Sequence, residues 1–372
     1  MQLIFDHQAF SYQDYGGVSR YFTELISRLR DVDNVDCYLS QKYSNNAYLS
    51  AYSFAHRTFL KGFDFKGKRK LLLWLNKVET EKNLKKRSFD VFHPTYYDPY
   101  FLNSLGNRPF VLTIFDMIHE RYPRYFAKHD QTSAFKKLLV SKANRIIAIS
   151  ESTKEDIVQI LGVDPARIDV VYLAAAFVHI MPGYVAPALL SSRFFLYIGN
   201  RNGYKNFDIL VRAISSISKD ERDLHLVCCG GGSFSKPEID LFRSKGLLQR
   251  VHYFAGTDEN MYSLYRKAEA FIFPSLYEGF GIPVLEAFLC GCPVILSKSS
   301  SLPEVGGDAP LYFDPLDELS LVAALKEVFF KAAKRTDMIE KGTEQLKKFS
   351  WDKTATATLA VYKKVLSTAC AA

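Results

Sequence analysis

The sequence predicts an α/β protein made of two doubly wound domains, each a parallel sheet covered by helices. Short apolar runs alternate with amphipathic segments of helical period along most of the 372 residues. The alternation lapses at residues 174–192, which carry Pro182, Gly183 and Pro187, and then restarts. Because buried strands that alternate with helices favour a parallel sheet, two such stretches indicate two domains in tandem.

The first stretch is expected to form an N-terminal domain over residues 1–180. The segment from Met1 to Asp6 has no basic region ahead of a long apolar run, so it is expected to be a first strand and not a signal peptide. Strands are predicted at residues 3–5, 35–39, 91–93, 110–114, 145–149 and 169–173, and helices at 18–29, 70–82, 134–143 and 154–161.

Residues 174–192 are interpreted as an interdomain linker, and residues 190–350 as the C-terminal domain. A last amphipathic helix is expected from residue 351 to 366, because Ala357, Ala360, Val361 and Val365 share one face. Strands are predicted at residues 194–198, 225–229, 251–254, 270–273, 293–296 and 311–313, and helices at 206–217, 237–245, 260–267, 284–290 and 316–331.

Composition excludes several classes of protein. The chain is 48% hydrophobic and 24% charged, which is typical of a globular protein and not of a disordered one. No apolar run approaches the roughly 18 residues that a membrane span needs. None of the six cysteines has metal-ligand spacing, so we expect reduced core thiols in a cytoplasmic protein.

Positive charge is concentrated at residues 61–87, where ten Lys and Arg residues face three acidic ones. Phe63, Phe65 and Trp74 lie in the same segment. A basic amphipathic helix with exposed aromatic residues can lie on an anionic membrane surface. A solvated helix face whose leucines point into the core would give the same pattern, so both interpretations stay open. No nucleic-acid partner is expected, because the chain has no recognised nucleic-acid motif.

The most informative segment is residues 277–286, Tyr-Glu-Gly-Phe-Gly-Ile-Pro-Val-Leu-Glu. It follows a predicted strand, and Pro283 suits the first turn of a helix. Glu278 is therefore expected on the loop at the carboxyl end of that strand, and Glu286 in the helix. Ligands bind at this edge of open α/β sheets, and a helix N-terminus there suits a phosphate. The alternative for Glu286 is that it only complements the helix dipole, which contributes about 0.3–1 kcal/mol.

Glycine-rich loops follow three other predicted strands. Gly16 and Gly17 lie after the first strand, Gly230 and Gly231 after the strand at 225–229, and residues 199–206 after the strand at 194–198. Glycines let the backbone approach a ligand closely, although an ordinary tight turn needs them equally. Arg201 and Lys205 beside a helix start suit a diphosphate, and the alternative is two solvent-facing cations.

Together these residues resemble a retaining glycosyltransferase of family 4, which has the two-domain GT-B fold. The strongest parts of the resemblance are the E-x7-E segment from Phe273 to Ala287 and the loop at 199–206. The resemblance implies that the C-terminal helix crosses back onto the N-terminal domain. Weaker support comes from residues 16–22, 92–97, 148–152 and 301–305.

The resemblance also implies residue roles. Glu278 would contact hydroxyls of the donor sugar, Glu286 the ribose hydroxyls of the nucleotide, and Arg201 with Lys205 the diphosphate. The same comparison implies a catalytic group formed by Glu278, Arg201, Lys205, Asp116 and His119. It implies further donor contacts from Gly16, Gly17, Gly199, Asn200, Gly279, Phe280, Gly281, Ile282, Gly230 and Gly231.

One departure concerns the N-terminal domain. Many family members carry a His-Asp pair after the strand at 110–114, but here Phe115 precedes Asp116, and His119 follows. Asp116 or His119 would orient the acceptor or the sugar, and a lone histidine can equally be structural. His93, Tyr96 and Tyr97 are the expected acceptor-binding residues, and His93 is expected to face the cleft.

No metal or other cofactor is expected. Asp31 and Asp33 match an Asp-x-Asp pattern, but they follow a helix and precede a strand, so we expect a solvated turn. The predicted reaction is transfer of a hexose from a nucleoside-diphosphate sugar to a glycan or lipid-linked acceptor in cell-surface polysaccharide synthesis. A GDP-mannose-like donor is favoured and a UDP-sugar is the alternative. The expected location is the cytoplasm, with residues 61–87 as a candidate contact to the inner face of the membrane.

Two other classes of function remain at this stage. A sugar-nucleotide epimerase can share the two-domain fold, but it does not predict the E-x7-E segment. A non-catalytic membrane-associated scaffold would keep the two cores and lose the charged site, whereas this chain retains Glu278, Glu286, Arg201 and Lys205.

Overall fold

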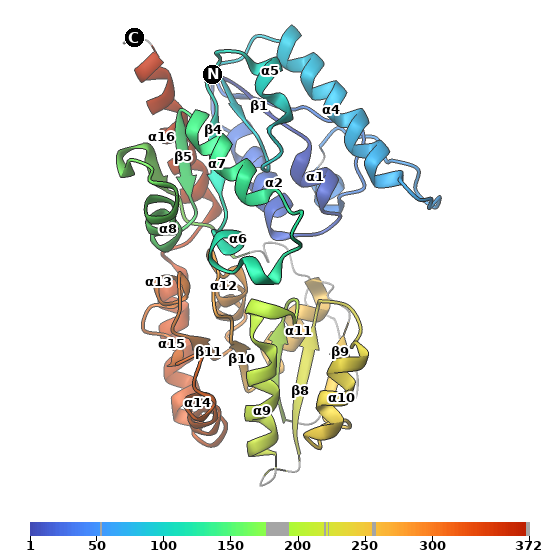
Figure 1. Cartoon of the computed structure of the whole chain (residues 1–372). Coiled ribbons are helices and arrows are strands. Elements are labelled where there is room, and N and C mark those ends of the chain that lie inside the picture. The colour runs from blue at the N-terminus through green and yellow to red at the C-terminus, as the bar shows by residue number, and fades with distance from the viewer. Residues whose placement is uncertain (53, 176–192, 219–220, 222, 255–257, 370–372) are drawn as a thin grey trace. The chain divides into compact units, whose positions relative to one another are not determined.

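The chain folds into two compact α/β units in the computed structural model (Figure 1). Unit 1 comprises Met1–Leu173 and Ser350–Ala372, and unit 2 comprises Ala174–Phe349. The structure describes all residues except 53, 176–192, 219–220, 222, 255–257 and 370–372. Nearly all of the segment interpreted as a linker, residues 174–192, lies outside the described residues.

Unit 1 contains two three-stranded parallel sheets, with strand orders β2-β1-β3 and β4-β5-β6. A parallel bridge between Phe92 and Phe110 joins β3 to β4. Leu3 pairs with Cys37 on one side of β1 and with Val91 on the other. The strands are β1 (Gln2–Phe5), β2 (Asp36–Leu39), β3 (Val91–His93), β4 (Val111–Ile114), β5 (Arg145–Ala148) and β6 (Ile168–Val170).

Helices connect and cover these strands. They are α1 (Gln8–Tyr12), α2 (Gly17–Arg30), α3 (Ala47–Ala51), α4 (Lys68–Lys86), α5 (Leu102–Leu105), α6 (Ile118–Arg121), α7 (Thr132–Lys142), α8 (Glu151–Leu161) and α16 (Trp351–Ala369). Helix α2 begins after Gly16 and turns a buried face of aromatic and aliphatic side chains, including Tyr21, Phe22 and Leu25, toward the core. Its apolar residues recur at helical spacing, so their burial stabilises the helix.

Unit 2 contains one six-stranded parallel sheet of order β12-β11-β10-β7-β8-β9. This is the strand order of a doubly wound dinucleotide-binding fold, in which the order of the strands reverses between β7 and β10. The strands are β7 (Arg193–Ile198), β8 (Leu224–Cys229), β9 (Val251–Phe254), β10 (Ala270–Phe273), β11 (Val294–Ser297) and β12 (Leu311–Phe313). The helices are α9 (Phe207–Ile217), α10 (Lys236–Ser244), α11 (Asp258–Lys267), α12 (Ile282–Leu289), α13 (Leu302–Gly306), α14 (Glu318–Phe330) and α15 (Ala332–Leu346).

One apolar core holds unit 2 together. Phe195, Leu226 and Ile272 from the sheet lie against Leu210 and Leu325 from α9 and α14. All five side chains are buried, so each removes apolar surface from water and contributes about 1.5–3 kcal/mol. The rigid sheet that results fixes the loops at the carboxyl ends of its strands.

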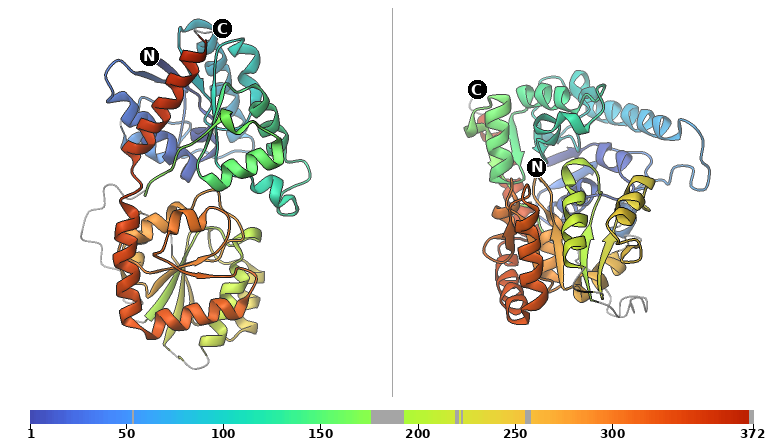
Figure 2. Two further views of the ribbon diagram at one scale, coloured as in Figure 1. Left: turned by 90° about the vertical axis from the view of Figure 1, so that its left-hand side faces the viewer. Right: turned by 60° about the horizontal axis from the view of Figure 1, so that its bottom comes forward.

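The C-terminal helix α16 belongs to unit 1, where it packs against α2, β3 and β5 (Figure 2). Tyr362 of α16 shares a hydrogen bond of 2.6 Å with His93 Nδ1, and Thr113 Oγ1 lies 2.9 Å from His93 Nε2. Trp351 at the start of the helix packs near Tyr21. The return of the C-terminal helix to the first domain, which the resemblance implied, is confirmed.

The predicted fold class of doubly wound parallel sheets in two domains is also confirmed. The sequence missed the short helices α1, α3, α5, α6 and α13, because four or five residues are too few to show a helical period. It also missed α15, whose polar residues outnumber its buried ones. The strand expected at residues 169–173 is shorter and lies at Ile168–Val170. No helix in the described part of the chain combines the length and the apolar character needed to cross a membrane.

The buried His93 makes the stability of the protein depend on pH. Burial lowers the pKa of His93 to about 3, whereas an unfolded histidine titrates near 6.5. Between these values the unfolded chain binds the additional proton, so the free energy of unfolding should rise with pH and level off above about 6.5. The slope that His93 contributes is at most about 1.4 kcal/mol per pH unit.

Urea unfolding at several pH values between 4 and 7 measures this slope. The variant His93→Phe should be less stable than the wild type and should have a shallower slope. Replacement of the exposed His129 by Gln is the matched control and should retain the wild-type slope. An unchanged slope in His93→Phe would show that His93 is not held neutral in the folded protein.

Candidate donor site in unit 2

The E-x7-E segment lies where the order of the strands reverses in the sheet of unit 2. Strands β7 and β10 are parallel neighbours, with Ala270 paired to Phe195. The chain leaves the carboxyl end of β7 at Gly199 and that of β10 at Pro274. Crevices at this edge are the usual ligand sites of open α/β sheets. The topology therefore brings the two loops singled out in the sequence, 199–206 and 274–281, to one place.

The loop between β10 and α12 has a shape that depends on Gly281. Gly281 precedes α12 and adopts a φ of +111°, and a Cβ atom there would meet Leu302 Cδ2 at 2.9 Å. Pro283 lies in the first turn of α12, as predicted, and Ile282 begins the helix. Both site carboxylates are largely buried, Glu278 at 9% exposure on the loop and Glu286 at 7% on α12. Phe280 is also buried and packs against Phe349, so its side chain supports the loop, and Gly279 lies between it and Glu278.

Serines that follow β11 hold this loop in position. Ser300 Oγ accepts a hydrogen bond of 2.9 Å from the backbone N–H of Glu278. Ser301 Oγ donates to the carbonyl oxygens of Glu278 at 2.9 Å and Phe280 at 3.0 Å. Sequence reasoning gave Ser300 no role, although the serine-rich run at 297–301 after a predicted strand was a signal that could have pointed to it.

The two loops meet through an ion pair. Lys205 Nζ lies 2.6 Å from Glu278 Oε1, and both side chains are mostly buried, at 16% and 11% exposure. Lys205 ends the short 3₁₀ turn Gly203–Lys205, and Asn206, the residue before α9, has a φ of +55°. Asn206 Nδ2 donates to the carbonyl oxygens of Pro274 and Pro315. The backbone around Lys205 is therefore fixed against the same loop that carries Glu278.

Glu286 lies on α12, the helix that follows the loop carrying Glu278 and that contacts β10 and β11. The hydroxyl of Tyr265 donates to Glu286 Oε2 at 3.2 Å. Burial raises the pKa of Tyr265 well above its ordinary value, and the charge of Glu286 adds to this effect. Burial likewise raises the pKa of Cys229 to about 11, and Glu286 contributes again.

Arg201 occupies a different environment from Lys205. Its side chain is only 3% exposed and forms an ion pair of 2.5 Å with Glu238. Its two terminal nitrogens donate to the carbonyl oxygens of Gly230, Gly232 and Ser233. The residue predicted to bind diphosphate thus lies close to the site, but its donors point at the loop after β8.

The glycines at this edge let the loops after β7 and β8 touch. Gly199 adopts a φ of +129° and donates its N–H to the carbonyl oxygen of Cys229 at 2.9 Å. A Cβ atom on Gly231 would meet the carbonyl oxygen of Gly199 at 2.9 Å and Asn200 Cα at 3.2 Å. A side chain at position 231 would not fit between these loops, which explains why this position is a glycine.

In unit 1, Gly16 lies at the N-terminus of α2. A Cβ atom on Gly16 would collide with the side chain of Gln13, whose Oε1 accepts a hydrogen bond of 3.0 Å from the N–H of Ser19. Gly17 begins the helix. The sequence did not anticipate that a side chain of the preceding loop caps this helix.

Of the residues expected to bind an acceptor, two lie inside unit 1. His93 is 1% exposed with both ring nitrogens hydrogen-bonded, so it does not face a cleft as expected. Tyr97 is buried as well, and its hydroxyl accepts from the N–H of Phe115 at 2.9 Å. Tyr96 is partly exposed and packs between Tyr12 and Tyr97.

Asp116 lies on the loop after β4 and His119 on the short helix α6, both near the buried Lys136. The ammonium of Lys136 lies 3.4 Å from Asp116 Oδ1 and 3.2 Å from Glu120 Oε2. Burial lowers the pKa of His119, and the charge of Lys136 lowers it further. The imidazole ring of His119 stacks on the ring of Phe126, and the two ring centroids lie 3.8 Å apart. Sequence reasoning missed Lys136, because a lysine on a predicted helix is ordinarily solvated.

No metal centre is apparent among the residues that the structure describes, where no group of three or more His, Cys, Asp or Glu side chains is arranged to hold an ion. The described cysteines are free and buried. Lys205 and Glu278 are paired on the loops that follow β7 and β10, Glu286 lies on α12, and Arg201 pairs with Glu238 at the loop after β8.

Comparison with known proteins identifies the family of this chain. Residues 15–174 match the family described as Glycosyltransferase Family 4, and residues 188–345 match Glycosyl transferases group 1. The chain is 30% identical over 287 residues to O-antigen chain mannosyltransferase B of Escherichia coli, which covers 73% of this chain and 74% of that protein.

Two solved structures share the fold. Sucrose-phosphate synthase from Thermosynechococcus elongatus superposes with a TM-score of 0.75 at 18% identity and covers 99% of both chains. Anabaena Alr3699/HepE, in complex with UDP and glucose, has a TM-score of 0.69 at 15% identity and covers 100% of this chain and 99% of its own. The chain is a glycosyltransferase with the GT-B fold. It belongs to glycosyltransferase family 4, which favours the transferase over the epimerase and scaffold alternatives.

The Lys205–Glu278 pair leads to a prediction for Glu278→Gln. Turnover should fall by about 100-fold or more, because we expect the carboxylate of Glu278 to lie at the reacting centre. Affinity for a nucleoside diphosphate should be retained or rise a few-fold, because Lys205 loses its carboxylate partner. Steady-state kinetics and calorimetric titration measure the two effects separately.

Glu269→Gln is the matched control, because Glu269 pairs with Arg193 at 2.6 Å with a similar exposed fraction but lies before β10. This variant should keep the wild-type turnover. Unchanged turnover in Glu278→Gln would show that the carboxylate of Glu278 does not take part in the reaction.

Proposed function

We propose that this enzyme transfers a hexose from a nucleoside-diphosphate sugar with retention of the anomeric configuration. The observation that carries the proposal is the Lys205–Glu278 ion pair, which lies where the order of the strands reverses in the sheet. Glu286 follows Glu278 by eight residues. A cation paired with one buried carboxylate, with a second buried carboxylate on the helix that follows, suits a ligand that carries both phosphate and hydroxyl groups.

Each group then has one role. The ammonium of Lys205 binds the diphosphate and stabilises the negative charge that grows on it as the glycosidic bond breaks. Glu286 accepts hydrogen bonds from the ribose hydroxyls. Glu278 accepts from hydroxyls of the donor sugar and stays close to the positive charge that develops on the ring.

The proposed reaction forms one bond and breaks one bond at the anomeric carbon. The bond to the diphosphate oxygen breaks through an oxocarbenium-like state, and the acceptor hydroxyl attacks from the same face. A phosphate oxygen of the leaving group takes the proton of that hydroxyl, so the products are the glycosylated acceptor and the nucleoside diphosphate. This route differs from double displacement in retaining hydrolases, where two carboxylates flank the bond.

The donor that we favour is GDP-mannose-like, with a UDP-sugar as the alternative. The relative that is 30% identical is named as an O-antigen chain mannosyltransferase, which supports mannose. The Anabaena protein of the same fold was solved with UDP and glucose, which supports the alternative. The acceptor that we propose is a glycan or lipid-linked saccharide in the synthesis of a cell-surface polysaccharide.

A thermal-shift panel of GDP, UDP, ADP and dTDP tests the donor assignment. A ligand that binds only the folded protein stabilises it by about 2.7 kcal/mol at a hundred times its Kd. We expect one nucleotide to raise the melting temperature with EDTA present, and GDP to do so more than UDP. If none of the four does so, the proposed donor class is wrong.

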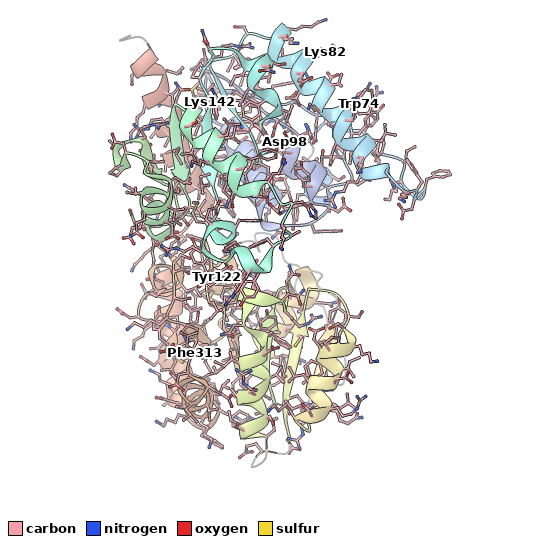
Figure 3. All side chains as sticks on the ribbon, viewed as in Figure 1. Trp74, Lys82, Asp98, Tyr122, Lys142 and Phe313 are labelled. Atoms are coloured by element: carbon pink, nitrogen blue, oxygen red, sulfur yellow. The ribbon has the colours of Figure 1, made fainter. Side chains whose placement is uncertain are left out.

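We further propose that unit 1 contacts an anionic membrane surface through residues 61–87. This segment carries ten basic and three acidic residues, hence +7 of the formal net charge of +8. Leu71, Trp74 and Val78 recur at helical spacing on α4 and are all exposed, and Lys82 and Lys85 continue the same stripe. Figure 3 shows Trp74 and Lys82 along α4. Phe63 in the preceding loop is 70% exposed.

Helix α4 buries some of its apolar side chains and leaves others exposed. Leu72 and Leu84 point into the core, as a solvated helix requires, whereas Trp74 is 58% exposed. An exposed apolar stripe among cations suits a surface that offers both anionic headgroups and acyl chains.

Fluorescence with vesicles tests this surface, because Trp74 is exposed and Trp351, the other tryptophan, is buried. Emission should shift to the blue on anionic vesicles, and Trp74→Ser should abolish the shift. Lys82→Gln with Lys85→Gln should weaken binding, mainly at low salt. Leu316→Ser, at an apolar residue of unit 2 that is even more exposed than Trp74, should bind like the wild type. Equal binding to neutral and anionic vesicles would contradict the proposal.

A further inference from the structure

Helix α7 carries a lysine whose ammonium group lies inside unit 1. Lys136 is fully buried, and its Nζ lies 2.8 Å from the carbonyl oxygen of Asp116, 3.4 Å from Asp116 Oδ1 and 3.2 Å from Glu120 Oε2. A lysine is rarely buried to this extent, because its charge loses the water that stabilises it. A buried ammonium therefore needs partners, and here the backbone and the side chains of one short segment supply them.

These oxygens belong to residues 116–120, which follow the carboxyl end of β4. The same ammonium lies over the ring of Tyr97, 5.3 Å from its centroid, and the Tyr97 hydroxyl accepts a hydrogen bond of 2.9 Å from the N–H of Phe115. Lys136 thus connects the segment after β3, which contains Tyr97, with the segment after β4. Ligands of parallel α/β sheets bind at this edge, beyond the carboxyl ends of the strands.

The Asp116 carboxylate is held through one of its two oxygens. Oδ1 accepts a hydrogen bond of 3.0 Å from the N–H of Ile118 and lies beside Lys136. Oδ2 has no hydrogen-bond partner among the residues that the structure describes, and the side chain is 28% exposed. A carboxylate oxygen accepts hydrogen bonds from hydroxyl groups. Oδ2 of Asp116 is therefore placed to receive a hydroxyl group of a ligand.

Stabilisation of the fold alone does not account for the buried lysine. Apolar side chains of similar volume are often as stabilising as a buried ion pair, because both charges lose their hydration. One ammonium also faces two carboxylates here, and Oε1 of Glu120 is buried without a partner in the described part of the chain. What the ammonium does provide is a fixed position for Asp116, since it contacts both the backbone and the side chain of that residue.

We propose that Lys136 is a positioning residue for the transfer reaction: it holds the segment after β4 so that Oδ2 of Asp116 accepts a hydrogen bond from a saccharide hydroxyl. This inference rests on the proposed function, in which a hexose passes to a glycan or lipid-linked acceptor. Displacement of a substrate-positioning group by about 1 Å can lower a rate by about 100-fold. The contacts of the buried ammonium oppose such a displacement of Asp116.

Lys136→Met tests this role, because methionine is a long unbranched side chain without a charge. Turnover should fall by about 100-fold. The Kd of GDP, or of UDP if that is the nucleotide that binds, should keep its wild-type value, because a nucleoside diphosphate carries no hexose for Asp116 to contact. Lys137→Met is the matched control, because it removes an exposed lysine from the next position of the same helix. This variant should turn over like the wild type.

The double variant Lys136→Met with Glu120→Gln separates positioning from charge balance. Lys136→Met alone leaves two carboxylates together and lowers the stability of the fold, whereas the double variant loses one charge of each sign and should regain part of the melting temperature. If Lys136 only balances charge, the double variant regains the wild-type turnover. If Lys136 positions Asp116, turnover stays low in the double variant.

Asp116→Asn keeps the buried ammonium and tests the carboxylate directly. It should lower turnover about as much as Lys136→Met, and the two changes together should be no slower than either alone, because both act through one carboxylate. Wild-type turnover in Asp116→Asn or in Lys136→Met, or its recovery with Glu120→Gln, overturns the positioning role while the proposed function stands. A wild type that transfers no hexose from a GDP-sugar or a UDP-sugar overturns the proposed function.

Discussion

The ion pair between Lys205 and Glu278 is the interaction on which the candidate site depends. It joins the two loops that leave the neighbouring parallel strands β7 and β10. The order of the strands in the sheet of unit 2 reverses between these two strands. A largely buried pair of opposite charges is stable only while both partners remain. The pair therefore joins two groups that a phosphate and a sugar hydroxyl could each engage.

The other features of the site keep these two charges in position. Ser300 and Ser301 fix the backbone of Glu278, and Gly281 lets the chain turn into α12 without a collision with Leu302. Behind them, Arg201 and Glu238 order the adjoining glycine loop. Strands β7 and β10 are both buried in one apolar core, so the ends of the loops that follow them are held in fixed positions.

Much of the fold could be predicted from sequence because parallel strands with two buried faces form continuous apolar runs, such as Ala-Phe-Ile-Phe at β10. The E-x7-E segment was equally readable, since its glycines and Pro283 have specific backbone roles. Helix α15 and the short helices were not, because polar composition or short length hides the helical period.

The site was only partly predictable. Arg201 and Lys205 look alike in sequence, and only the positions of Glu238 and of the carbonyl groups after β8 distinguish them. His93 looked like a cleft residue because it ends a strand, but its partner Tyr362 comes from a helix 269 residues away. Contacts between distant segments of this kind leave no local signal in the chain.

Hydrogen exchange with and without saturating nucleoside diphosphate tests the central claim most directly, because it locates the ligand without any substitution. The account predicts that new protection is concentrated in peptides covering residues 199–206, 230–234 and 276–289. Protection confined to another surface, such as the groove lined by Asp308, Lys341 and Glu344, would contradict the assignment of the donor site to the strand reversal of unit 2.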